Sequence, residues 1–129
     1  MPRLAEIMRP EPLVVAPEDT LGEVAERMTA ENVGAVIVKD YGRMIGILTE
    51  RDLLKAMAAR VHTSEARVRQ WMTEDPLTAS ADADAEEAAQ IMLEQGFRHL
   101  PVLDEAGNVT GIVSLRRVVA ATKAAADRA

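Results

Sequence analysis

The sequence of 129 residues contains no cysteine. Disulfide bridges, thiol nucleophiles and cysteine-ligated zinc are therefore excluded, which fits a reducing compartment. Aromatic residues make up only 2% of the chain, as Trp71, Tyr41 and Phe97. The core must therefore be built from aliphatic side chains and methionine, and a bound base would meet aliphatic walls rather than an aromatic stack.

Long hydrophobic runs and an excess of positive charge are also missing. The apolar runs reach four or five residues, as in 34–38, whereas a membrane span needs about 20. The N-terminus lacks the apolar region of a signal peptide, so a cytoplasmic protein without membrane contact is expected. Acidic residues outnumber basic ones by 21 to 15. Direct nucleic-acid binding is not expected, because phosphate contacts need clustered lysine and arginine.

What the sequence does contain is an internal repeat. Residues 7–13 align with residues 71–77, so that Met8 falls on Met72. One extra residue in the second half shifts the alignment by one, and residues 46–49 then fall on residues 111–114. An ordered series of matches across both halves indicates duplication. The repeat predicts two domains, residues 1–62 and residues 63–129.

Each half has the same predicted order of elements, β-α-β-β-α, which is an α/β fold. Capping patterns at Thr20 and Asp84 precede the first helix of each half. A unit of about 64 residues buries only a marginal fraction of its surface, so the two sheets are expected to share one core. The other predicted elements are strands at 13–15, 35–38, 44–48, 77–79, 100–103 and 109–113, and closing helices at about 50–60 and 115–125.

Three segments together resemble the cystathionine-beta-synthase (CBS) domains. They are the openings 7–8 (IM) and 71–72 (WM), residues 96–102 (GFRHLPV) and residues 46–54 (GILTERDLL). The resemblance covers about residues 4–121 and implies two intertwined repeats that pack as a pseudo-two-fold pair, with two related clefts between them. It also implies a homodimeric regulatory module that binds an adenosine-containing ligand, requires no cofactor or metal and catalyses no reaction.

The pattern Gly46-x-x-Thr49-x-x-Asp52 lies where a strand becomes a helix. Gly46 permits a close backbone approach or an unusual backbone angle, and unpaired N–H groups beside the Thr49 hydroxyl favour a phosphate. A carboxylate in the first turn can accept hydrogen bonds from both hydroxyls of a ribose. The resemblance gives Thr49 the phosphate and Asp52 the ribose. The same spacing is a helix-capping box, which explains most isolated cases and is compatible with ligand binding.

The resemblance places Arg98 and His99 at the phosphate of the nucleotide that the first repeat holds. A guanidinium fork suits phosphate oxygens, and an imidazole adds a donor. These two residues favour AMP, ADP or ATP over S-adenosylmethionine. The contacts around adenine are assigned by resemblance to Met8, Pro12, Leu13, Val33, Gly34 and Ala35.

The second repeat lacks these groups. Ser114 keeps the cap, but Arg117 replaces the aspartate, and a guanidinium only donates hydrogen bonds. One competent nucleotide site per chain is therefore predicted. Two alternatives for Arg117 stay open: holding a phosphate in another pose, or pairing with an acid such as Asp82. The alternative function is a ligand-free interaction module that acts through dimerisation, and no regulated partner protein is identified.

Overall fold

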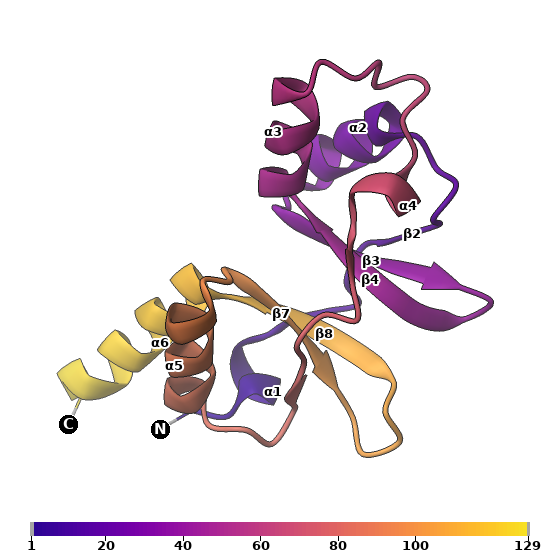
Figure 1. The fold of residues 1–129 in the computed structure, drawn as a ribbon. Coiled ribbons are helices and arrows are strands. Elements are labelled where there is room, and N and C mark those ends of the chain that lie inside the picture. Colours follow the sequence, from indigo (N-terminus) through magenta and orange to yellow (C-terminus); the bar gives the residue numbers. More distant parts are fainter. Residues whose placement is uncertain (1, 129) are drawn as a thin grey trace. The chain divides into compact units, whose positions relative to one another are not determined.

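The computed structural model describes residues 2–128, which form two units (Figure 1). The first-repeat unit runs from Leu13 to Pro76, and the second-repeat unit combines the described residues up to Pro12 with those from Leu77 onward. Each unit contains one four-stranded sheet. In both sheets, one outer strand runs parallel to its neighbour and the other outer strand runs antiparallel to its neighbour. The predicted α/β class with two β-α-β-β-α repeats is confirmed.

The first-repeat unit has strand order β2-β3-β4-β5. Its elements are β2 (Val14–Val15), α2 (Leu21–Glu31), β3 (Ala35–Asp40), β4 (Arg43–Thr49), α3 (Glu50–Ala58), α4 (Val68–Trp71) and β5 (Thr73–Glu74). The second-repeat unit has strand order β1-β8-β7-β6. Its elements are α1 (Leu4–Ile7), β1 (Arg9–Pro10), β6 (Ala79–Ser80), α5 (Ala85–Gln95), β7 (His99–Leu103), β8 (Val109–Ser114) and α6 (Leu115–Arg128).

The two repeats exchange their opening segments. The Leu4 N–H donates to the Ala83 carbonyl at 2.9 Å, and β1 pairs with β8 of the second repeat. In the same way α4 and β5, which open the second repeat, join the first-repeat unit, where β5 pairs with β4. The free edge of each long hairpin is thus covered by the other repeat's opening, which removes unpaired backbone groups from the edge. The predicted division between residues 62 and 63 follows the sequence repeat. Each structural unit contains residues from both sides of that division.

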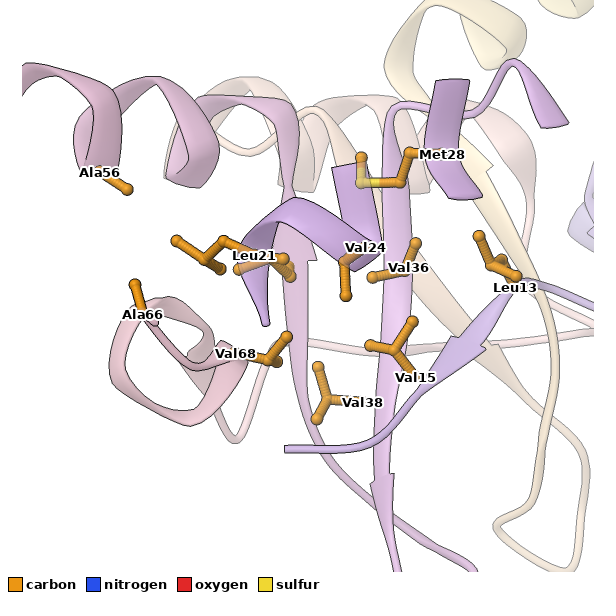
Figure 2. Packing of buried hydrophobic residues seen from close by; sticks show 11 residues of the cluster. Leu13, Val15, Leu21, Val24, Met28, Val36, Val38, Ala56, Ala66 and Val68 are labelled. Carbon is orange, nitrogen blue, oxygen red and sulfur yellow. The ribbon is translucent and has the colours of Figure 1, made fainter. Parts of the chain in front are cut away.

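The core of the first-repeat unit is aliphatic, as the composition predicts. Val36 and Val38 of β3 belong to one buried cluster with Leu21 and Val24 of α2, and all four side chains are fully buried (Figure 2). Helix α2 begins at the predicted cap, because the Thr20 hydroxyl accepts from the Glu23 N–H at 3.2 Å. Burying a valine or leucine contributes about 1.5–3 kcal/mol. The helix is therefore held mainly by this face rather than by intrinsic propensity.

At Gly46 the segment Met72–Thr73, which leads into β5, approaches β4 closely. A β-carbon at Gly46 would lie 2.7 Å from the Thr73 carbonyl oxygen and 2.8 Å from the Met72 sulfur. The second repeat has the same arrangement at Gly111, where Met8 and the Arg9 carbonyl oxygen occupy the equivalent space. The close backbone approach predicted for Gly46 is present, and the approaching segment belongs to the chain itself.

Gly46→Ala is expected to lower the free energy of unfolding by about 1–3 kcal/mol, because the added methyl group overlaps a backbone oxygen that pairing fixes. Urea unfolding followed by the fluorescence of Trp71, the single tryptophan, measures the loss. Gly34→Ala is the matched control, since its nearest neighbour is the flexible Glu50 carboxylate at 3.1 Å. Equal losses in the two variants would contradict the packing role of Gly46.

Candidate functional site

The candidate site is built on the capping box that begins α3. Asp52 Oδ2 accepts hydrogen bonds from the Thr49 N–H at 2.9 Å and from the Thr49 hydroxyl at 3.1 Å. The Asp52 N–H donates to the Thr49 hydroxyl oxygen at 3.4 Å. Asp52 is only 8% exposed, which makes it the one buried ionisable side chain among the described residues. The local spacing therefore produces a cap, as the sequence predicts.

The cap leaves part of the Asp52 carboxylate available. A carboxylate has about four lone-pair positions, and the two hydrogen bonds that it accepts both fall on Oδ2. Within residues 2–128, no group donates a hydrogen bond to Oδ1. Every fully buried side-chain oxygen of the described residues has a hydrogen-bond partner. Because Oδ1 has none, it is not fully buried, and solvent reaches it. The carboxylate can therefore accept further hydrogen bonds without breaking the cap.

The start of α3 offers fewer donors to a phosphate than the sequence predicts. The N–H groups of Thr49 and Asp52 serve the cap, and the Glu50 N–H donates to the Gly34 carbonyl at 3.0 Å. In the described chain, the Arg51 N–H is the amide of the first turn that has no acceptor. Of the N–H groups that the sequence analysis expected to be unpaired, those of Thr49, Glu50 and Asp52 have acceptors within the chain. The Thr49 hydroxyl would have to turn away from Asp52 to donate to a ligand.

Gly34 and Ala35 lie beside the cap. Strand register pairs Ala35 with Thr49, and the Glu50 carboxylate lies over the hydrogen atoms of Gly34. Sequence reasoning gave Glu50 no role, although it is the first residue after the cap. Leu13 is 8% exposed and belongs to the hydrophobic core, and Val33 packs against that core. Much of both side chains is therefore committed to packing.

The second repeat reproduces this geometry with different chemistry. The Leu115 N–H donates to the Arg98 carbonyl at 2.8 Å, His99 pairs with Ser114, and the Arg117 N–H donates to the Ser114 hydroxyl at 3.1 Å. In the first repeat, the Glu50 N–H donates to the Gly34 carbonyl in the same way. There, too, Ala35 pairs with Thr49, and the Asp52 N–H donates to the Thr49 hydroxyl. Arg117 has no carboxylate with which to return a bond to Ser114, so the cap is one-sided.

The alternative pairing of Arg117 with Asp82 is wrong. Asp82 lies 3.7 Å from Arg3 instead, in an ion pair whose two side chains are both more than 60% exposed. Such an exposed pair contributes little stability. Arg117 is exposed and forms no ion pair with any described residue.

The predicted site residues divide between the two units. Gly34, Ala35, Thr49 and Asp52 are brought together within the first-repeat unit. A nucleotide site that combines residues of both units stays a proposal. The first-repeat unit also holds Leu13, Val33 and Gly46, and the second-repeat unit holds Met8, Pro12, Arg98 and His99.

The described residues contain neither a candidate metal site nor a helix that could cross a membrane. Within residues 2–128, no group of three or more histidine, aspartate or glutamate side chains is placed to hold a metal ion. None of the described helices has both the length and the apolar character needed to cross a membrane.

A comparison with protein-family models finds the CBS domain twice, at residues 4–59 and at residues 68–123. The chain belongs to the CBS domain family. It carries a tandem pair of these domains, which confirms the resemblance drawn from residues 7–8, 46–54 and 96–102.

Relatives and solved structures resemble this chain over most of its length. The chain is 37% identical over 115 residues to an uncharacterized 17.7 kDa protein of Acidianus ambivalens, matching 88% of this chain and 69% of the relative. A CBS-domain containing protein from Agrobacterium tumefaciens is 34% identical, with a TM-score of 0.82 over 88% of this chain and 90% of that one. CBSX2 of Arabidopsis thaliana, solved in complex with AMP, is 26% identical, with a TM-score of 0.77 over 95% of this chain and 96% of that one.

Proposed function

We propose that this CBS pair is a cytoplasmic regulatory module that senses AMP, ADP or ATP through one competent site per chain. The observation that carries the proposal is Asp52, a largely buried carboxylate whose Oδ1 is open to solvent and accepts no hydrogen bond from the described residues. Two vicinal hydroxyls of a ribose fit the acceptor positions that the cap leaves unused. The similar fold of CBSX2, a protein solved with AMP, supports this ligand class.

The rest of the proposed site comes from both repeats. Arg98 and His99 of the second repeat are assigned to the phosphate, because the start of α3 has few N–H groups left for it. The flat base is assigned to the small residues Gly34 and Ala35 beside Thr49, where it would take the place of the flexible Glu50 carboxylate. Remaining contacts around adenine are assigned to Met8, Pro12, Leu13 and Val33. Gly46 is assigned to the strand end that leads to Thr49 and Asp52.

One site per chain follows from the difference between the two caps. Asp52 offers acceptors to a sugar, whereas Arg117 offers only donors. The residues that correspond to Arg98 and His99 in the first repeat are Gly34 and Ala35, which carry no charge. The second position therefore lacks both the sugar acceptor and the opposing cation.

Signalling is proposed to work by a population shift. A nucleotide that contacts both repeats favours the arrangement that closes around it. At a concentration of about 100 times Kd, binding adds about 2.7 kcal/mol to the bound state. That free energy is sufficient to change a homodimer geometry or a surface that a partner protein recognises. No cofactor and no catalysed reaction are part of the proposal.

Isothermal titration with AMP, ADP, ATP and S-adenosylmethionine tests the proposal. A phosphorylated nucleotide is expected to bind at one per chain and more tightly than S-adenosylmethionine, because Arg98 and His99 suit a phosphate. Two nucleotides bound per chain would contradict the one-site assignment. No binding of any of the four would refute the sensor function.

An interaction module without a ligand is the second candidate. Leu54 and Met57, three residues apart on α3, are 66% and 69% exposed, which leaves an apolar strip on that helix. A homodimer through helical faces would use such a strip. This candidate predicts a dimer by light scattering and a melting temperature that none of the nucleotides raises.

A further inference from the structure

A surface pocket lies on the first-repeat unit, in the segment that joins α3 to α4. Its volume of about 420 Å³ is within the range of small-molecule sites. None of its residues belongs to the proposed nucleotide site. It is lined by Val61, His62, Glu65, Ala66, Gln70 and Trp71.

The pocket has an apolar floor and a polar rim. Val61 and Trp71 pack against the hydrophobic core, and Ala66 is 7% exposed. His62, Glu65 and Gln70 are exposed. The Gln70 side-chain oxygen accepts from the Arg67 N–H at 2.9 Å, which fixes this side of the rim. An indole surface next to three polar groups is typical of a site that orients a ligand with one apolar and one polar end.

The charge of the pocket comes from Glu65. In the described chain its carboxylate has neither an ion pair nor a hydrogen bond. The two nearby arginines do not line the pocket and are held elsewhere. Arg67 Nη1 donates to the Glu18 carbonyl at 3.0 Å, and Arg69 Nε donates to the Glu18 carboxylate at 2.8 Å.

Arg69 is also tied to Asp40, whose carboxylate lies 3.6 Å from its Nη2. The hydrogen bond with Glu18 raises the pKa of Arg69, so this guanidinium stays charged where it is. Arg69 is therefore committed to two other carboxylates, and Arg67 to a backbone carbonyl. The negative charge of Glu65 is left without a neighbouring positive group on the pocket's rim.

We propose that this pocket binds a small primary amine, with its ammonium group at Glu65 and its apolar body against Trp71. An ammonium group carries three donors and no acceptor. The Glu65 carboxylate on the rim supplies the acceptors, and the face of an indole attracts a cation. A ligand with these two ends uses the charge, the acceptors and the floor together.

Tryptophan fluorescence has one source in this chain, Trp71, and that residue lines the pocket. The probes are 2-phenylethylamine and its neutral analogue 2-phenylethanol, titrated into the whole chain. The amine is expected to give a saturable change and to bind about tenfold more tightly than the alcohol, since only the amine pairs with Glu65.

Glu65→Gln keeps the shape of the rim and removes its charge, and is expected to weaken amine binding about tenfold without affecting the alcohol. Glu105→Gln, an exposed glutamate of the second-repeat unit, is the matched control and leaves amine binding unchanged. Equal binding of the two probes, unchanged binding by Glu65→Gln, or no saturable signal would each overturn the proposal. Nucleotide is left out of these titrations, so the result is independent of the sensor function.

Discussion

Asp52→Ala is expected to weaken AMP binding about a hundredfold or more. Each charge-assisted hydrogen bond from a ribose hydroxyl to this carboxylate contributes about 1.5–3 kcal/mol, and the variant removes two of them. A loss of about 1.4 kcal/mol corresponds to a factor of ten in Kd. Isothermal titration of AMP into the two proteins measures the difference.

The control for this experiment has to separate binding from capping. Asp52→Ala also removes the half of the α3 capping box that its side chain supplies, the bonds that Oδ2 accepts from Thr49, at a cost of about 1 kcal/mol. Asp84→Ala removes a capping bond of similar expected strength, because Asp84, the N-cap residue of α5, accepts through Oδ1 from the Glu86 N–H at 2.9 Å. This variant should lose similar stability and keep full AMP affinity. If Asp52→Ala binds AMP as tightly as the unchanged protein, the carboxylate does not hold the sugar.

Leu4→Ala is expected to lower the free energy of unfolding by about 2–5 kcal/mol. Leu4 is fully buried in the core of the second-repeat unit, together with Met92 and Leu100, and its truncation leaves a cavity there. Urea unfolding measures the total loss. Because the opening segments are exchanged, amide hydrogen exchange should rise most in β7 and β8, although Leu4 belongs to the first repeat in sequence.

Leu93→Ala is the matched control for Leu4→Ala. Leu93 lies on α5 of the same unit but is 67% exposed, so its truncation should change stability by no more than about 0.5 kcal/mol. The exchange of opening segments would be refuted if Leu4→Ala increased hydrogen exchange in β3 and β4 and left β7 and β8 protected.

The duplication allowed most elements to be predicted, and the errors lie at their ends. The strand predicted at 35–38 extends to Asp40, and the hairpin turn follows with positive φ angles at Tyr41 and Gly42. The helix predicted to about residue 60 ends at Ala58, whereas the last helix continues to Arg128. Helix ends are poorly encoded because the last turn can fray or tighten at little cost.

The short opening elements were not predicted at all. Helices α1 and α4 have four residues each, and β1 and β5 have two. Segments of this length carry no measurable periodicity, and an isolated helix of one turn is unstable in water. Pairing with the other repeat stabilises them, so their own residues contain little signal.

By itself the sequence determined the duplicated fold, the cap formed by Thr49 and Asp52, and the loss of its carboxylate at Arg117, since all of these depend on neighbours along the chain. Only the tertiary structure decided which repeat each opening joins and how many N–H groups remain at the start of α3. The Glu50 N–H is taken by Gly34, sixteen residues away, and Leu4 by Ala83. Such partners are chosen by long-range packing, which local spacing does not encode.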